Sequence, residues 1–312
     1  MANASTLKPI SLRILALVVM FVPAAARAET NEVSYSPAGM PVAPGASPPS
    51  SIPATLNLPR NAVGSIPAVV IVHASGGLLP NGPEPDYVAA FTEAGMATFV
   101  IDMWTPRGVP AGAAAFGGLG GIDRRPRTPV DTLPDVFGAL KFLAANPAID
   151  ARRIGVMGFS WGAALSFLAA SELAAVRALD SKLRFAAHAG HYFVCWPYLP
   201  GGPGAGAEAM PRTGAPIQLQ VAGQDDYDDA DGGASCTKLV EGLPQAKREH
   251  VTLLVHANAS HAWDVKLPGP MTFEDRFSHR GRGGPVRFVP DQTVAAAARS
   301  ATIAFFQAAF GR

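Results

Sequence analysis

A pentapeptide near the middle of the chain, Gly158-Phe159-Ser160-Trp161-Gly162, decides which fold we expect. It follows an apolar run at residues 154–157 and precedes small and apolar residues at 163–170, which are typical of a buried helix. This arrangement predicts a strand, a sharp turn and a helix, with Ser160 exposed at the turn. Glycines suit both flanks because strand and helix backbones approach closely there. A Gly-Ser turn without chemistry is the alternative interpretation of the pentapeptide alone.

A nucleophilic serine needs a base and an acid, and candidates for both follow it in the chain. Asp225 is the first carboxylate after the apolar segment 217–221, and His261 lies in the segment that follows 251–255. Parallel strands carry such residues at their carboxyl ends, so we expect both side chains to meet Ser160 at one edge of a sheet. A neutral imidazole would take the serine proton, and a carboxylate would fix the imidazole tautomer.

Other acids and one other histidine compete for these roles. Asp102 ends an earlier apolar segment, and four more carboxylates follow Asp225 in its loop: Asp226, Asp228, Asp229 and Asp231. We favour Asp225 because it comes first after the strand and is best placed to turn inward. His256 sits near the strand end, where a side chain is more often packed or exposed. We therefore prefer His261, which has room to reach across the site.

Two backbone N–H groups should stabilise the oxygen on which negative charge develops. Trp161, directly after the nucleophile, supplies one. The other is expected in the glycine-rich loop 73–78, which follows the apolar segment 68–72. We prefer Ser75 there, with Ala74 as a close alternative. A glycine-rich turn that binds nothing is the alternative for this loop taken alone.

Together these motifs resemble the dienelactone hydrolase family. The resemblance spans roughly residues 54–310 and rests on segments 67–73, 101–109, 155–162, 222–227 and 259–264 and on a closing helix that ends near Phe306. It implies the α/β-hydrolase fold, a mostly parallel central sheet flanked by helices in a single domain. It also implies that Ser160, Asp225 and His261 are nucleophile, acid and base.

The resemblance carries one departure that bears on the substrate. The founding enzymes use a cysteine nucleophile with a glutamate nearby, whereas this chain has Ser160 and, at the glutamate position, Ala74. A serine member looks like an ordinary hydrolase of carboxylic esters or lactones, acting through an acyl-enzyme without a cofactor. A serine peptidase of similar fold and a non-catalytic secreted binding protein are the alternatives.

Composition agrees with one sizeable enzyme domain. The chain has 312 residues, of which 48% are hydrophobic and 16% charged, and its formal net charge is +1. This balance gives no reason to expect nucleic acid or an anionic membrane as a partner. No phosphate-binding loop or dinucleotide fingerprint is present. We expect a small-molecule ester or lactone as the partner, and the oligomeric state stays open.

The N-terminus is typical of a signal peptide. Lys8 and Arg13 precede an apolar run at 14–22, and Ala26-Arg27-Ala28 has the small-x-small pattern of a cleavage site. We expect a signal peptide at 1–28, cleavage near Ala28/Glu29, a secreted or periplasmic protein and no stable membrane insertion; a retained anchor is the minor alternative. Residues 29–51, rich in Pro, Gly, Ala and Ser, are expected to be a flexible segment before the domain at 52–312.

Periodicity predicts alternating strands and helices in the rest of the domain. Helices are expected over 87–94, 129–145 and 291–309, with strands at 97–101 and 185–187. Two long insertions, 103–127 and 192–212, leave the sheet on its carboxyl side and are expected to form pocket walls. Trp104 and His191 are therefore predicted to line the substrate pocket, although packing beneath the loops is the plainer alternative.

The two cysteines and two nearby histidines raise the questions of a disulfide and a metal site. Cys195 and Cys236 both lie near the carboxyl edge, so one disulfide or two buried thiols are equally compatible with the sequence. His188, His191 and Cys195 could suggest a metal centre, but no further carboxylate or histidine cluster accompanies them. We expect no metal.

Overall fold

A computed structural model describes residues 1, 28–40, 48–60, 62–110, 128–179, 182–206 and 212–311. Its centre is a mostly parallel sheet that, within these ranges, has eight strands in the order β1-β2-β4-β3-β5-β6-β7-β8. They are β1 (Glu29–Tyr35), β2 (Ile52–Leu58), β3 (Ile66–Val72), β4 (Ala97–Ile101), β5 (Ile149–Phe159), β6 (Ala187–His191), β7 (Ile217–Gln224) and β8 (Val251–Ser260). Pairing is parallel from β4 to β8, while β2 is antiparallel to both β1 and β4. The predicted fold class is confirmed.

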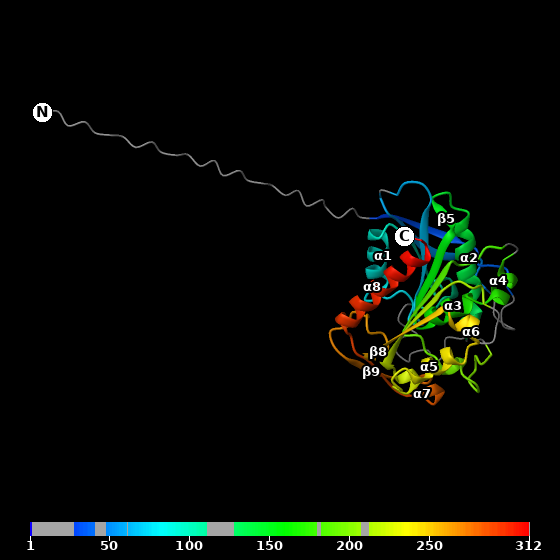
Figure 1. The fold of residues 1–312 in the computed structure, drawn as a ribbon, viewed down its shortest axis with the longest axis vertical. Helices are drawn as coiled ribbons and strands as arrows, with labels where there is room; N and C mark the ends of the chain where they lie inside the picture. Colours follow the sequence, from blue (N-terminus) through cyan, green and yellow to red (C-terminus); the bar gives the residue numbers. More distant parts are fainter. Residues whose placement is uncertain are drawn as a thin grey trace.

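Helices cover both faces of the sheet (Figure 1). One face packs against α1 (Glu84–Glu93) and α8 (Gln292–Ala309), and the other against α2 (Leu133–Ala144) and α3 (Trp161–Ala169). Strand β3 shows why both faces need cover. All of its residues are buried, and successive side chains enter opposite cores, with Val70 on the α2–α3 side and Val69 on the α1–α8 side.

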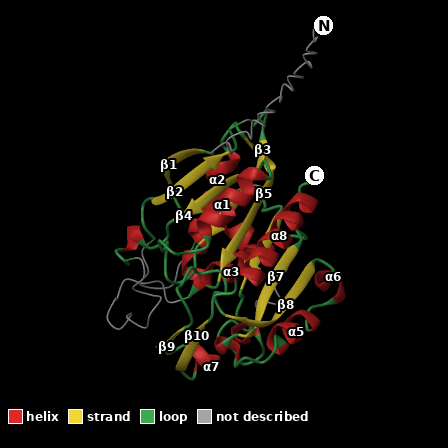
Figure 2. Cartoon of the chain, turned by 90° about the vertical axis from the view of Figure 1, so that its left-hand side faces the viewer, coloured by secondary structure: helices red, strands yellow, loops and turns green. Residues whose placement is uncertain are grey.

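Shorter elements complete the chain at the edges of the sheet. The remaining helices are α4 (Glu172–Ala178), α5 (Ala234–Glu241), α6 (Gln245–Arg248) and α7 (Ser278–Gly281), and 3₁₀ turns lie at Thr105–Arg107, Pro129–Thr132, Trp196–Tyr198 and Asp226–Asp228. A two-stranded hairpin, β9 (Met271–Asp275) and β10 (Gly284–Phe288), lies with α7 beyond the carboxyl ends of the central strands (Figure 2). The sequence did not lead us to expect this hairpin. Among the described helices, none combines the length and apolar character needed to cross a membrane.

The predicted helices occur with adjusted ends. The last begins after Asp291, whose carboxylate accepts hydrogen bonds from the N–H groups of Thr293 and Val294, both 3.0 Å long. The helix expected over 129–145 is instead a 3₁₀ turn followed by α2. Pro134 has no N–H to continue the hydrogen bonding of the preceding turn, so the regular helix starts there afresh.

The structure corrects our prediction that residues 29–51 form a flexible segment. Their first part is strand β1, which pairs with β2 from Glu29↔Leu58 to Tyr35↔Ile52. Tyr35 is buried, and its hydroxyl donates a 3.0 Å hydrogen bond to the Asp135 carbonyl. β1 is an edge strand with mostly exposed side chains, so its sequence has little apolar alternation to reveal it. The predicted signal peptide lies almost wholly outside the described residues.

Two further differences concern the segment around β6. The strand spans Ala187–His191 rather than 185–187, so His188 and His191 belong to the strand and not to a loop. Beyond it, Cys195 and Cys236 form a disulfide that ties this segment to α5. Of the two possibilities that the sequence left open, the disulfide is therefore the one present.

Candidate active site

Ser160 lies at the sharp turn between β5 and α3. Its backbone is in an unusual conformation, with φ 51° and ψ −106°, and its N–H donates a 3.0 Å hydrogen bond to the His191 carbonyl. The flanking glycines are required by close contact: a Cβ on Gly158 would collide with the backbone of Gly162, and one on Gly162 would collide with the Val72 carbonyl. The pentapeptide thus has the residues that this strained turn needs.

Three predicted side chains meet at the carboxyl edge of the sheet. His261, directly after β8, is 2.9 Å from the Ser160 Oγ through its Nε2 and 2.7 Å from the Asp225 Oδ2 through its Nδ1. Asp225, which follows β7, is buried, and its other oxygen accepts a 3.0 Å hydrogen bond from the Tyr227 N–H. With Nδ1–H donating to the carboxylate, Nε2 is left to accept the serine proton. We refer to this arrangement as the Ser160–His261–Asp225 chain.

The four competing acids of this loop serve other contacts. Asp226 accepts a 2.7 Å hydrogen bond from the Arg287 N–H. Asp228 accepts from the N–H groups of Cys195 and Trp196, and burial raises its pKa to about 7. The other two, Asp229 and Asp231, form ion pairs with Arg280 of the α7 turn.

The two remaining competitors also lie apart from Ser160. Asp102 caps the turn that follows β4, accepting hydrogen bonds from the N–H groups of Trp104 and Thr105. His256 is part of β8 itself, and its Nε2 lies 2.9 Å from the Gln220 Oε1. Its side chain contacts the ring of Trp263 with centroids 5.0 Å apart. Of the two candidate histidines, His261 beyond the strand end is the one that contacts Ser160.

Aromatic rings surround the imidazole of His261. Tyr192 and Tyr227 meet it edge-on, with ring centroids 4.9 and 4.7 Å away, and Phe288 stacks on it at 5.6 Å and 29°. The side chain of His261 is almost completely buried as a result. This packing restricts the ring to the orientation in which both nitrogens have their partners.

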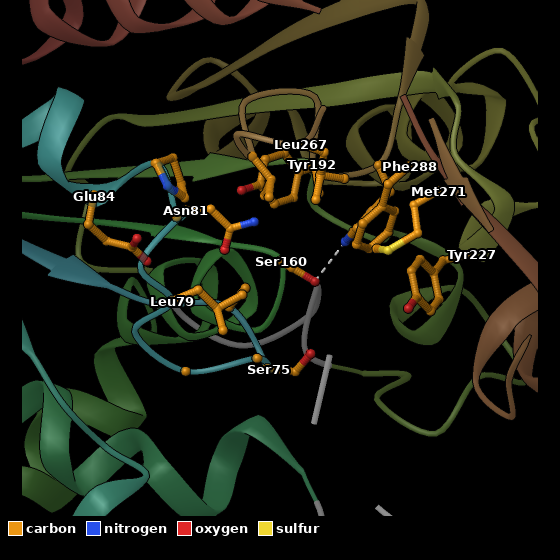
Figure 3. A pocket seen from close by; sticks show the side chains of 18 residues that line it. Ser75, Leu79, Asn81, Glu84, Ser160, Tyr192, Tyr227, Leu267, Met271 and Phe288 are labelled. Carbon is orange, nitrogen blue, oxygen red and sulfur yellow. Dashed lines mark hydrogen bonds between the residues drawn. The ribbon is translucent and has the colours of Figure 1, made fainter. Parts of the chain in front are cut away.

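The residues predicted to stabilise the oxyanion lie beside Ser160. Ala74 and Ser75 both line the pocket that opens at Ser160, and Figure 3 shows Ser75 next to it. Trp161 is the first residue of α3, and N–H groups in the first turn of a helix point towards its N-terminal end. His73 positions the loop: its Nε2 accepts a 3.0 Å hydrogen bond from the Met103 N–H, and its Nδ1 is 2.7 Å from the Ala74 carbonyl.

The prediction that Trp104 and His191 line the substrate pocket is wrong. Trp104 is buried under the 73–77 loop, where its indole N–H donates a 2.8 Å hydrogen bond to the Ser75 carbonyl. His191 is fully buried against α8 and is 2.7 Å from the Thr302 Oγ1, and desolvation lowers its pKa to about 3. His191 ends β6 and Trp104 follows β4. Both side chains pack between the sheet and its neighbouring elements and do not face the pocket at the carboxyl edge.

Other segments form most of the described pocket wall (Figure 3). They are the loop 74–84 after β3, the loop 261–271 after β8 and the hairpin residue Phe288. Of the two insertions, the described part contributes Tyr192 alone, while 111–127 and 207–211 lie outside the described residues. The residues that sequence reasoning missed include Asn81, Glu84 and Met271. The unusual length of the loop between β3 and α1 was the one available signal for the first two.

Among the described residues, His188 and His191 do not join a group of three potential metal ligands. His188 is buried, with its Nδ1 2.9 Å from the Ser166 carbonyl. In the described part of the chain, one group of potential ligands comes together, Cys195, Asp228 and Cys236. Its two sulfurs are joined in the disulfide, so neither is a thiolate available to a metal.

Known proteins share this architecture at low sequence identity. A candidate dienelactone hydrolase from Klebsiella pneumoniae superposes with a TM-score of 0.60 at 14% identity, covering 88% of this chain and 98% of that one. A dienelactone hydrolase from Anabaena variabilis gives 0.51 at 18% identity, with coverages of 88% and 96%. The dienelactone hydrolase-like promiscuous phosphotriesterase P91, from metagenomic libraries, gives 0.55 at 15% identity, with 90% and 98%. The superpositions show a shared fold.

A family model settles the relationship where individual relatives cannot. No curated protein matches this sequence. The model of the dienelactone hydrolase family, however, matches residues 52–310, which span the sheet from β2 onwards and all residues of the Ser160–His261–Asp225 chain. The protein is a hydrolase that belongs to the dienelactone hydrolase family.

Proposed function

We propose that this protein is a serine hydrolase of carboxylic esters or lactones. The observation that supports it is the unbroken Ser160–His261–Asp225 chain, with Ser160 at the floor of an apolar pocket. Nucleophile, base and acid are in hydrogen-bond contact without rearrangement, as acyl transfer requires. The cofactor-free chemistry of such a site needs no group beyond these side chains and the backbone.

The proposed reaction has two stages. Ser160 Oγ attacks the substrate carbonyl while His261 Nε2 takes its proton, and Asp225 stabilises the imidazolium. The negative oxygen is held by the N–H groups of Trp161 and Ser75, or of the neighbouring Ala74. His261 then protonates the leaving alkoxide, leaving an acyl-enzyme on Ser160. Water, activated by the same imidazole, releases the acid in the second stage.

Export is part of the same proposal. The basic, apolar and small-x-small pattern of residues 8–28 is the support from the sequence. The Cys195–Cys236 disulfide adds independent support, because such bonds persist in oxidising compartments. We infer that the protein acts in the periplasm or outside the cell.

Ester turnover with and without the serine tests the mechanism. Purified wild type, Ser160→Ala and the surface control Ser65→Ala are assayed on p-nitrophenyl esters, simple lactones and a peptide p-nitroanilide. We expect ester and lactone hydrolysis by wild type and Ser65→Ala, little peptide cleavage, and a loss of about 10⁴-fold in Ser160→Ala. A fluorophosphonate probe should label wild type and Ser65→Ala but not Ser160→Ala. Near-normal turnover by Ser160→Ala would show that the nucleophile lies elsewhere.

A further inference from the structure

Glu84 is an unusual member of the pocket wall. It is the first residue of α1, only 6% exposed, and it lies on the opposite side of Ser160 from Tyr227 (Figure 3). Among the described lining residues it is the one carboxylic acid, and no lysine or arginine accompanies it. The Ser160–His261–Asp225 chain does not involve it. A buried acid without a catalytic task needs another explanation.

The Glu84 carboxylate has no cationic partner among the described residues. Lys266, whose backbone bonds to Asn81 on the pocket rim, directs its ammonium to Asp86, 2.7 Å away. The charge that acts on Glu84 is instead Asp264, of the same sign, which is buried and bonded by the hydroxyls of Tyr87 and Tyr192. Burial and this repulsion raise the pKa of Glu84 to about 7. The ionised form therefore lacks a compensating charge.

Gly82 gives the carboxylate its place. A Cβ at this position would collide with the Glu84 Oε2, so the carboxylate lies over the glycine. Gly82 does not adopt a left-handed backbone, so its conformation alone does not explain a glycine here. The absent side chain is what leaves room for an acid facing the cavity.

We propose that Glu84 binds a cationic group, a protonated or quaternary amine, carried by the ester substrate. This inference rests on the proposed ester hydrolysis and names its substrate class. An ammonium would supply the missing counter-charge, whereas an anionic substrate group would meet an acid of its own sign. The neighbouring apolar side chains Leu79, Val265 and Leu267 suit the methylene or methyl groups that surround such a nitrogen.

Isosteric ester pairs separate charge from shape. The first pair is acetylcholine, an ester with a trimethylammonium group, and 3,3-dimethylbutyl acetate, which has a tert-butyl group in its place. A second pair places the same two groups on the acyl side of p-nitrophenyl esters. We expect wild type at pH 8.5 to prefer the charged member of at least one pair by about tenfold or more in kcat/KM, mainly through KM. Glu84→Gln should bring this ratio close to one.

Two further variants sharpen the test. Glu93→Gln removes an exposed carboxylate from the same helix and should keep the wild-type preference. Gly82→Ala retains the acid but displaces it, and should lower the preference as Glu84→Gln does. A preference that survives Glu84→Gln, or no preference by wild type in either pair, would overturn the inference.

Binding without turnover distinguishes this inference from the hydrolase proposal. Choline chloride is titrated calorimetrically into Ser160→Ala and into Ser160→Ala/Glu84→Gln. Binding to the first alone is expected. If wild type hydrolyses the neutral esters but choline does not bind, the cation site is wrong and the hydrolase remains. If choline binds but no ester is hydrolysed, the proposed chemistry fails while the site stands.

Discussion

Phe288 stacks on the imidazole of His261, with ring centroids 5.6 Å apart and an interplanar angle of 29°. The phenyl ring comes from β10, so the hairpin beyond the sheet covers one face of the His261 imidazole. An imidazole held between rings loses less freedom when it accepts and returns a proton. The hairpin therefore does more than close the pocket.

Phe288→Ala should uncover that face of His261. We expect kcat to fall by about tenfold, because the ring no longer holds the imidazole against Ser160 and Asp225. Phe277→Ala is the matched control, since Phe277 lies on the same hairpin and is 45% exposed. Steady-state kinetics of both variants on one short ester measure the change in kcat. Equal effects of the two substitutions would mean that the contact with His261 contributes nothing.

Asp225→Asn should reduce kcat by about 10³–10⁴-fold and leave the fold intact, because the amide cannot stabilise the imidazolium as the carboxylate does. Asp226→Asn removes the next carboxylate, which accepts the Arg287 N–H, and should retain most of the activity. Circular dichroism melts of both variants establish that any rate loss is not unfolding. A reversal of the two effects would assign the acid to Asp226.

The sharp turn at Ser160 was predictable because its determinants are local. Gly158, Ser160 and Gly162 are required by contacts within one turn and the strand beside it. Asp225 and His261 could be chosen because each follows a strand of clear apolar character. The mostly parallel sheet with helices on both faces was predictable from the succession of apolar strands and helices along the chain, whereas the order of the strands was not.

The pocket was not predictable, because distant segments form it. Phe288 and Met271 line the pocket from a hairpin of two five-residue strands, and periodicity does not determine where such a separate hairpin lies relative to Ser160. Whether Trp104 and His191 face the cavity or the layers beneath depends on small rotations at strand ends, which periodicity does not determine. For Glu84 the long loop before α1 was the one signal, and it did not single out this residue, since an acid in the first turn of a helix is ordinary.

Trp104→Phe should act through stability and the 73–77 loop instead of through substrate choice. The substitution removes the hydrogen bond to the Ser75 carbonyl and opens a small cavity. We expect it to lower the free energy of unfolding by about 1–3 kcal/mol. Rates on short and bulky esters should fall by a similar factor. Chemical denaturation and an ester series measure the two effects. A large change in relative kcat/KM with unchanged stability would place the indole in the pocket after all.

The disulfide closes a chain segment with a sequence separation of 41 residues. Its reduction should lower the free energy of unfolding by about 2–4 kcal/mol, mainly by releasing the unfolded chain. Thermal melts with and without dithiothreitol measure this, and the stability of Cys195→Ala/Cys236→Ala should not depend on the reductant.

Intact-mass analysis of the exported protein tests both the N-terminus, which we expect near Glu29, and the disulfide. If Cys195 and Cys236 both react with an alkylating agent in the denatured, unreduced protein, the disulfide is absent.

The buried Glu84 should make stability depend on pH. Its pKa is raised from 4.5 to about 7, first by burial and then by Asp264, so the folded protein holds this proton where the unfolded chain has lost it. Stability from this group is therefore full below pH 4.5 and declines as the pH rises towards 7. Glutamine does not titrate, so the unfolding free energy of Glu84→Gln should rise relative to that of wild type as the pH rises across that range.

Between pH 5.5 and 8.5 the difference in unfolding free energy between Glu84→Gln and wild type should grow by about 2 kcal/mol in favour of glutamine. Asp228, a buried acid whose pKa is also raised, is present in both proteins and cancels in the difference. Asp264 repels the Glu84 carboxylate, so the loss of this repulsion in Glu84→Gln adds to the difference in the same direction. Glu93→Gln, on the exposed side of the same helix, should give a flat difference. Choline, if it pairs with Glu84 as proposed, should raise the wild-type melting temperature more at pH 8.5 than at pH 5.5. A difference that shrinks with pH would mean that Glu84 is stabilised as an anion by a partner, and its proton would then not be retained on folding.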